Sequence, residues 1–340
     1  MVARSTTACQ TGACQTERWK QDLADAFSDA ETLLQSLGLH SQDIPDLDPT
    51  PAAWRMRVPR GFAALMQPGD PDDPLLRQVL PRQIERALVP GYVTDPVGDV
   101  AAGLSQGLIR KYAGRVLLIA SGACAIHCRY CFRRHAPYSA LGAQAPRLAA
   151  AIARIADDPT LDEVVLSGGD PLMLDDDQLD ALIAQFDAIG HLQRLRIHSR
   201  LPVVLPTRVT ERLCARLAGS RLAPVLVIHV NHARELGEAA AEALRRLKEA
   251  GVTLLNQSVL LRGVNDDASR LIRLSERLFA CGVLPYYLHQ LDPVQGAAHF
   301  QVSDADAAGL METLRAQLPG YLVPRLVREV PGADAKRPIH

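Results

Sequence analysis

An apolar run leads directly into three cysteines in the sequence Arg115-Val-Leu-Leu-Ile-Ala-Ser-Gly-Ala-Cys-Ala-Ile-His-Cys-Arg-Tyr-Cys131. The run 115–120 predicts a short buried strand, and Cys124, Cys128 and Cys131 follow on the loop that leaves it. Three thiolates in this spacing bind three irons of a cubane and leave the fourth iron open to a small molecule. A parallel barrel presents its reactive groups on such loops. The stretch therefore predicts a 4Fe-4S cluster at the mouth of a βα barrel.

A zinc site is the alternative interpretation of three close cysteines. In that case His127 or His135 is the fourth ligand, and the metal is structural. The aromatic neighbours Tyr130 and Phe132 favour a cluster, because aromatic rings shield it from water. The remaining cysteines have no ligand spacing relative to the three: Cys9, Cys14, Cys214 and Cys281.

Short apolar strands alternate with amphipathic helices from residue 115 onward. The expected strands are 115–120, 163–167, 194–198, 224–230, 253–259 and 284–287. This alternation predicts parallel βαβ units, and six strands are too few for a closed eightfold barrel. We therefore expect an α/β fold, a partial (β/α)6 barrel like part of a TIM barrel. The right-handed crossover rule places the carboxyl ends of all these strands on one rim, where the following loops converge.

The chain divides into three predicted regions. Residues 1–105 contain proline-rich segments at 46–51 and 68–74 between short helical stretches, which indicates a mostly helical accessory region. Residues 106–300 form the barrel, and 301–340 form a C-terminal segment.

Composition narrows the function classes. The 340 residues are 48% hydrophobic and 22% charged, which is ample for a sizeable core. The formal net charge of −1 leaves no electrostatic footprint for nucleic acid. Seven cysteines, an odd number, suit a reducing compartment better than a disulfide framework. Neither a signal peptide nor a membrane-spanning run is evident, so we expect a cytoplasmic protein that does not bind membranes.

Polar residues are expected at the rim after later strands. Gly168, Gly169 and Asp170 follow the second strand, where glycines let the backbone approach a ligand and a carboxylate receives an ammonium group. The same three residues are also typical of a simple turn. His229 and Gln257 belong to the fourth and fifth strands, and they either face a ligand or are satisfied internally.

The cysteine run resembles that of radical S-adenosylmethionine (SAM) enzymes. That resemblance implies that the three cysteines bind the cluster and that the Gly-Gly-acid segment, with His229 and Gln257, contributes to SAM binding. Longer strings then narrow the family: Tyr112, Arg115, the run 124–134, the run 167–171, the run 198–206, the run 256–265 and the run 285–287 together resemble lysine 2,3-aminomutase. The likeness covers about residues 90 to 340. It is greatest to the short members that supply β-lysine for elongation factor P, and an N-terminal match at 72–79 supports that likeness.

The family resemblance implies pyridoxal 5′-phosphate (PLP) as a second cofactor, which requires a lysine that forms a Schiff base. By position this lysine is Lys336, although the sequence alone reads it as a solvated tail residue. None of Lys20, Lys111 and Lys248 lies in a comparable glycine-containing loop. The loop departs from the family at residues 333–335. The resemblance also assigns Tyr112 and Arg115 to the PLP phosphate.

Recognition of L-lysine is likewise implied by the resemblance. Arg133 corresponds to the arginine that pairs with the substrate carboxylate. A guanidinium suits this role because it can donate two hydrogen bonds to one carboxylate. Asp292 and Glu329 correspond to the two acids that receive the distant ammonium. Glu329 stands in place of an aspartate, and His289 stands where a tyrosine is expected. These two changes are expected to weaken or reshape lysine binding.

The implied reaction moves the amino group of L-lysine from C2 to C3, after a 5′-deoxyadenosyl radical removes hydrogen from C3. The implied partners are a reductant such as flavodoxin or ferredoxin and an elongation factor P lysyl ligase; a homo-oligomer is compatible with the sequence. The chain ends at His340, and this favours the elongation factor P role. Within the same chemistry the alternative is an aminomutase that makes free β-lysine or acts on another amino acid. A radical SAM enzyme that modifies RNA, or a noncatalytic zinc protein, is the alternative from a different class.

Overall fold

The computed structural model describes residues 11–50, 54–103, 107–136 and 145–339. Its centre is a sheet whose strands follow chain order from β1 to β9. Strands β2 to β8 pair in parallel, and β1 and β9 join the two edges in antiparallel fashion. The strands are β1 (Leu108–Ile109), β2 (Arg115–Ser121), β3 (Glu163–Gly168), β4 (Arg194–Ser199), β5 (Ala223–Ile228), β6 (Thr253–Val259), β7 (Leu284–His289), β8 (Arg325–Arg328) and β9 (Arg337–Pro338).

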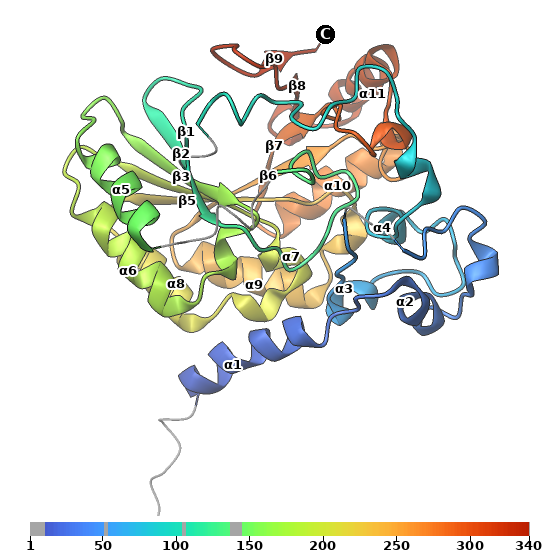
Figure 1. The fold of residues 1–340 in the computed structure, drawn as a ribbon, viewed down its shortest axis with the longest axis horizontal. Helices are drawn as coiled ribbons and strands as arrows, with labels where there is room; N and C mark the ends of the chain where they lie inside the picture. Colours follow the sequence, from blue (N-terminus) through green and yellow to red (C-terminus); the bar gives the residue numbers. More distant parts are fainter. Residues whose placement is uncertain (1–10, 51–53, 104–106, 137–144, 340) are drawn as a thin grey trace, which may run out of the picture.

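Helices between successive parallel strands lie on the outer side of the curved sheet (Figure 1). They are α5 (Ala145–Ala156), α6 (Asp176–Asp187), α7 (Leu201–Val204), α8 (Glu211–Ala218), α9 (Glu238–Glu249), α10 (Ala268–Ala280) and α11 (Asp304–Gln317). The N-terminal region adds α1 (Thr11–Ala24), α2 (Ala30–Ser36), α3 (Arg60–Ala63) and α4 (Pro74–Arg77). No helix among the described residues is both long and apolar enough to cross a bilayer.

Local sequence explains the βαβ units. All six residues of β3 are buried, which is typical of a parallel strand covered on both faces. The following helix α6 begins with a capping box: the amide of Gln178 donates to the carboxylate of Asp175 at 3.0 Å, and the amide of Asp175 donates back to the Gln178 side chain at 3.0 Å. The helix then buries an apolar stripe that includes Leu179 and Phe186.

The predicted α/β partial barrel is confirmed. Each of the six expected strands is present, with ends within two residues of those predicted. Strand β8 was not predicted; it pairs with β7 through Leu326 and Leu288 and extends the parallel sheet. Its residues Arg-Leu-Val-Arg do not alternate between apolar and polar, so only their pairing identifies them as a strand. The predicted boundary at residue 105 lies outside the described residues.

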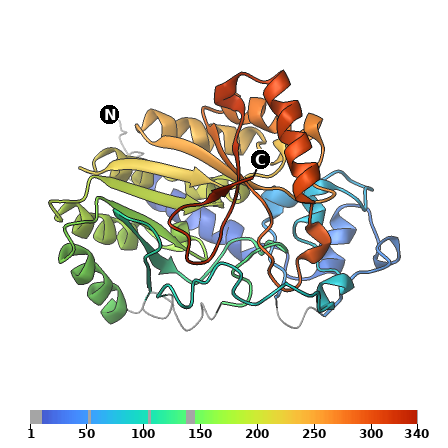
Figure 2. The same ribbon diagram turned by 90° about the horizontal axis from the view of Figure 1, so that it is seen from above.

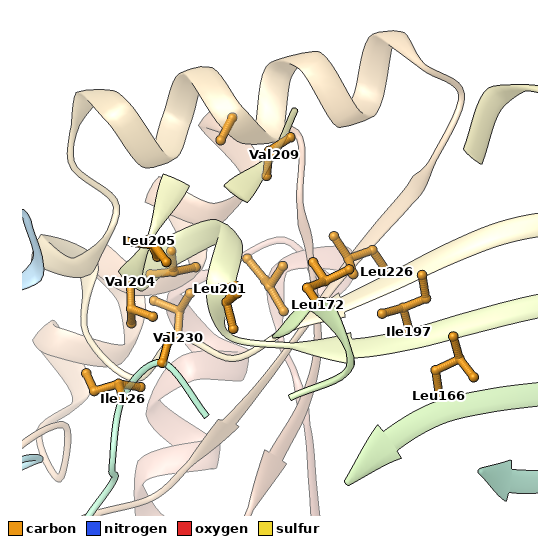
Figure 3. Packing of buried hydrophobic residues seen from close by; sticks show 14 of the residues in the cluster. Ile126, Leu166, Leu172, Ile197, Leu201, Val204, Leu205, Val209, Leu226 and Val230 are labelled. Carbon is orange, nitrogen blue, oxygen red and sulfur yellow. The ribbon is translucent and has the colours of Figure 1, made fainter. Parts of the chain in front are cut away.

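A buried apolar cluster ties the cysteine loop to the barrel (Figure 3). Leu166, Ile197 and Leu226 are register partners on β3, β4 and β5, so they form one layer across the sheet. Ile126, between the first two cysteines, belongs to the same cluster as Val230 and is 4% exposed. Burying one such side chain stabilises the fold by about 1.5–3 kcal/mol. The cysteine loop is therefore anchored in the core before any ligand binds.

The C-terminal segment returns over the sheet. Strand β8 pairs with β7, and β9 turns back to pair with β8 through Val327 and Pro338. Figure 2 shows the last residues, in dark red, crossing the middle of the molecule. Because Lys336 directly precedes β9, this turn determines where the lysine lies.

Candidate active site

One cavity of about 500 Å³ lies at the carboxyl ends of the parallel strands. It is lined by residues from the cysteine loop, from the ends of β3 to β7 and from the C-terminal segment. Every residue that the sequence analysis assigned to the site lines this cavity: Cys124, Cys128, Cys131, Tyr112, Arg115, Arg133, Gly168, Gly169, Asp170, His229, Gln257, Asp292, Glu329 and Lys336. The structure therefore brings together residues that are more than two hundred positions apart in the chain, and their individual roles stay predictions.

The cysteine loop is held by the N-terminal region. The indole of Trp54 donates to the carbonyl of Cys128 at 3.1 Å, and the guanidinium of Arg57 donates to the carbonyl of Cys124 at 3.3 Å. Behind the loop, Glu85 accepts hydrogen bonds from Arg129 at 2.6 Å and from Arg134 at 2.7 Å. All three of these charged side chains are at most 5% exposed. Their charges therefore have to be paired with one another.

The cysteine thiols suit an iron–sulfur cluster. Burial raises the pKa of Cys131 to about 11, and burial with the charge of neighbouring Cys131 raises the pKa of Cys124 well above its usual value. Such thiols ionise only when cations join them. No three His, Cys, Asp or Glu side chains in the described part of the chain converge as one metal ion requires. A cubane needs no such convergence, because each thiolate binds a different iron.

The two histidines of the zinc alternative contact backbone carbonyls. The Nδ1 atom of His127 lies 2.7 Å from the carbonyl oxygen of Arg55. The Nε2 atom of His135 lies 2.9 Å from the carbonyl oxygen of Gln295. Neither histidine lines the cavity with the cysteines.

The two glycines after β3 allow a close approach to the cysteine loop. A Cβ atom on Gly168, which has a φ of +126°, would lie 2.3 Å from the carbonyl oxygen of Ser121. A Cβ atom on Gly169 would lie 2.4 Å from the carbonyl oxygen of Ala123. Instead, the amide of Gly169 donates to Ser121 and the amide of Asp170 donates to Ala123, each at 2.8 Å. Glycine is required here because any side chain would push the loop away.

Asp170 already has partners within the protein. Its carboxylate accepts hydrogen bonds from the hydroxyl of Ser199 at 2.8 Å and from the amides of Arg200 at 2.8 Å and Leu172 at 3.0 Å. Burial raises the pKa of this carboxyl to about 6. Its predicted contact with an ammonium group would add to these bonds and lower the pKa again.

Polar residues directly after β5 and within β6 divide into two groups, one that lines the cavity and one that bonds the backbone. His229 lines the cavity and its Nε2 atom lies 2.9 Å from the Tyr130 hydroxyl; burial lowers the pKa of His229 far enough to keep the ring neutral. Gln257 also lines the cavity. The neighbours Asn256 and Ser258 instead bond the backbone of Val230. The sequence alone did not separate these two groups.

At the opposite end of the cavity Lys336 forms an ion pair with Glu329. The hydroxyl of Tyr112 donates to the other oxygen of Glu329 at 2.7 Å, and the Lys336 ammonium lies 5.8 Å from the ring centre of Tyr287. Arg115 stacks its guanidinium 4.8 Å from the ring centre of Tyr112. The residues predicted to contact PLP thus form one connected group.

Asp99 and Lys111 are site residues that the sequence analysis did not assign. The carboxylate of Asp99 is 2.7 Å from the Lys111 ammonium and accepts a hydrogen bond from Arg133 at 2.9 Å. Arg133 and Lys111 outweigh burial and hold the pKa of Asp99 below its usual value. Asp99 lies in a loop outside any strand, so no strand-end signal pointed to it.

Five residues that line the cavity each have a buried polar atom without a hydrogen-bond partner among the described residues. These atoms are Oδ1 of Asp292, Nε2 of His289, Nε2 of His198, Nε of Arg196 and Nε of Arg200. Burial raises the pKa of Asp292 to about 7 and lowers that of His289 to about 3. Buried polar groups without partners are costly, so their presence around a cavity indicates that a polar ligand completes them. The cavity therefore fits a ligand that has hydrogen-bonding groups.

The comparison with family models identifies the class of protein. The Radical SAM superfamily matches residues 118–274, which include the cysteine loop and strands β3 to β6. A crystal structure of a radical SAM methyltransferase from Sphaerobacter thermophilus aligns with a TM-score of 0.44 at 20% identity, over 65% of this chain and 68% of that chain. That structural similarity is too distant to bear on function. The fold and the cysteine site define a radical SAM enzyme.

Curated relatives are similar over nearly the whole chain. A protein named L-lysine 2,3-aminomutase from Escherichia coli K12 is 48% identical over 95% of this chain and 94% of its own length. Proteins of the same name from Haemophilus influenzae Rd and Clostridium subterminale are 45% and 34% identical, each over 94% of this chain and over 95% and 77% of their own lengths. The chain belongs to the lysine 2,3-aminomutase family. It is an isomerase, and its family implies a 4Fe-4S cluster, SAM and PLP.

Proposed function

We propose that this enzyme converts L-lysine to β-lysine by moving the amino group from C2 to C3, with PLP as well as SAM. One observation carries the proposal: the same cavity contains the three cysteines, Lys336, and the two acids Asp292 and Glu329. The relatives' name, L-lysine 2,3-aminomutase, supports the choice of substrate.

At the cysteine end, Cys124, Cys128 and Cys131 would hold the cluster. Asp170 and His229 line the adjacent wall and would hold SAM, together with Gly168, Gly169 and Gln257. When bound, the reduced cluster and SAM supply a carbon radical that removes hydrogen from the substrate. The protein keeps water from this radical, and Ala125, Ile126 and Phe132 are apolar residues of the cavity wall.

At the lysine end, Lys336 would bind PLP and Tyr112 with Arg115 would contact its phosphate. When bound, PLP supplies a conjugated ring that delocalises an unpaired electron. Lys336 is available to a ligand because its side chain is 24% exposed and its partner Glu329 also bonds Tyr112. Lys111 also lines the cavity, but its ammonium contacts both Asp99 and the carbonyl of Val97 at 2.7 Å.

Charge complementarity supports a basic amino acid as substrate. Arg133 would pair with the substrate carboxylate, and Asp292 and Glu329 would pair with the distant ammonium. The unpartnered Oδ1 of Asp292 offers an acceptor to that ammonium. A neutral side chain would leave a buried carboxylate without a counter-charge, which is costly.

We further propose that the product serves the modification of elongation factor P through a lysyl ligase, with flavodoxin or ferredoxin as the electron donor. The support is sequence similarity: identity is higher to the Escherichia coli and Haemophilus influenzae proteins than to the longer Clostridium subterminale protein. A free β-lysine product without transfer to elongation factor P would contradict this part alone.

The test is anaerobic reconstitution with iron, sulfide and PLP, followed by incubation with SAM, dithionite and L-lysine. We expect β-lysine, detected by chromatography and mass spectrometry. A panel of other amino acids under the same conditions checks the substrate. An enzyme with an intact cluster and bound PLP that leaves lysine unchanged but isomerises another amino acid would overturn the assignment of lysine.

A further inference from the structure

A buried arginine contacts one of the three cysteine sulfurs. Arg200 directly follows β4 and is 6% exposed. Its Nη1 atom donates to the sulfur of Cys128 at 2.7 Å and to the hydroxyl of Tyr130 at 2.8 Å. Its Nη2 atom donates to Gln78 at 2.7 Å and to Glu235 at 2.9 Å. The guanidinium therefore lies between a predicted cluster ligand and a buried carboxylate.

The surrounding hydrogen bonds fix the position of this guanidinium. Glu235 is 0% exposed, and its other oxygen accepts hydrogen bonds from the amide of Asn231 and from the side chain of Gln78, each at 3.0 Å. The side-chain amide of Asn231 donates to Tyr130 at 2.7 Å. Tyr130, Gln78 and Glu235 are thus each held by at least one further bond, and the arginine has little freedom to turn away from Cys128.

Arg200 keeps its positive charge in this environment. A guanidinium is not deprotonated in proteins, and the Nη2 atom of Arg200 pairs with the buried carboxylate of Glu235 at 2.9 Å. A charge–charge interaction is stronger in a buried, low-dielectric site than in water. The contact with Cys128 is therefore between a cation and a sulfur that would carry negative charge.

We propose that Arg200 sets the reduction potential of the cluster through Cys128, and that Glu235 limits this effect. The proposal rests on the cluster assignment made above. Reduction adds an electron to the cluster, and a cation that donates a hydrogen bond to a ligand sulfur stabilises the reduced state. Arg200 therefore makes the cluster easier to reduce. The negative charge of Glu235 partly compensates the positive charge of Arg200, so the two residues shift the reduction potential in opposite directions.

The experiment measures the cluster potential directly in anaerobically reconstituted enzyme without SAM, by a redox titration followed by electron paramagnetic resonance. For Arg200→Gln we expect at least a tenfold loss in the equilibrium constant for one-electron reduction, a fall of about 59 mV. Arg200→Lys keeps the charge but not the two-pronged donor geometry, so a smaller fall is expected. Glu235→Gln is expected to shift the potential upward.

A matched control separates this effect from general damage. Arg208 is a second fully buried arginine, at 0% exposure, and pairs with Asp176 at 2.8 Å without lining the cavity. Arg208→Gln removes a buried charge of the same kind and should lower the melting temperature without moving the potential. The opposite signs expected for Arg200→Gln and Glu235→Gln are not produced by loss of folding alone.

Each outcome decides the proposal. An iron-loaded Arg200→Gln enzyme with the parent potential overturns it, and so does a shift that appears only after SAM is added, because that would assign Arg200 to SAM. If Arg200→Gln binds no iron, Arg200→Lys and Glu235→Gln decide by the direction of their shifts. A parent enzyme that binds no iron would instead overturn the cluster assignment on which the proposed function depends.

Discussion

The two ends of the cavity are built differently. At the cysteine end, the ion pairs Arg129–Glu85 and Arg200–Glu235 have side chains at most 6% exposed, and they link the cysteine loop to the N-terminal region and the barrel. At the lysine end, Lys336 and Lys111 are 24% and 18% exposed, and their partners face the cavity. From this difference we expect the cysteine end to be the more rigid, and the charges at the lysine end to exchange partners when ligands bind.

The largest effect is expected at the rigid end. Cys128→Ala removes one of the three proposed cluster ligands and should abolish β-lysine formation and lower the iron content, while the circular dichroism spectrum stays that of the parent. Cys214→Ala, which changes a half-buried cysteine outside the cavity, is the control and should keep iron and activity. Unchanged activity in Cys128→Ala would refute the cluster assignment.

A comparable loss of activity is expected at the lysine end, with the cluster retained. Lys336→Ala should remove the visible absorbance band of bound PLP and lower activity by roughly 10³-fold or more, since the residue would act as part of a unit. Iron content should not change. Lys248→Ala, outside the cavity, is the control. A PLP band that persists in Lys336→Ala and disappears in a Lys111→Ala variant would move the assignment to Lys111.

The stability of the two ends should differ as their burial does. Glu85→Gln leaves Arg129 and Arg134 without a counter-charge and should lower the free energy of unfolding by about 3–5 kcal/mol. Glu329→Gln breaks a pair in which the Lys336 side chain is 24% exposed and remains open to water, so a smaller loss is expected. Denaturant unfolding of the apo-protein measures both. Equal losses would contradict the contrast between the two ends.

A smaller effect concerns pH at the lysine end. Burial raises the pKa of Asp292 to about 7, so in the absence of ligand this carboxyl is largely protonated below that pH. Binding of a substrate ammonium requires the ionised form. The KM for lysine should therefore rise by up to roughly tenfold for each pH unit below about 7. Asp292→Asn should bind lysine weakly at every pH, and Asp177→Asn, at an exposed surface position, should behave as the parent.

The same shift predicts a pH dependence of stability. In the unfolded chain Asp292 loses its proton near the ordinary pKa of 3.8, whereas the folded chain keeps this proton until about pH 7. The folded state therefore binds more protons between these values, and this group lowers stability as the pH rises from about 4 to about 7. Melting temperatures of the unliganded parent and Asp292→Asn across that range should diverge, with the parent losing more. Parallel curves would show that Asp292 is not buried as described.

Much of the fold followed from the sequence. The strand periodicity and the alternation with helices specified six parallel strands and their common rim, because these signals are local. Strand β8 gave no such signal, because its residues Arg-Leu-Val-Arg do not alternate between apolar and polar, and its identity depends on pairing with β7. The prediction of a partial barrel was correct without it.

Some residues of the site were predicted from the sequence and others were not. The cysteine spacing is a local signal, and the other assigned residues followed from their place in strings that resemble a family. Arg200 follows a predicted strand within such a string, so its position was a usable signal for the site. Asp99 and Glu85 lie outside strands, and nothing near them in the sequence shows which charges they meet.

The sequence by itself predicted a ligand set for a cluster and determined the parallel architecture around it, because residue spacing and hydrophobic period act over a few neighbouring positions. The tertiary structure alone decided that Lys336, near the end of the chain, shares a cavity with Cys128, and that Arg200 places its charge on that cysteine. The physical reason is that burial and pairing of charges depend on distances in space. These distances are set only when the sheet has folded, and the order of residues along the chain does not show them.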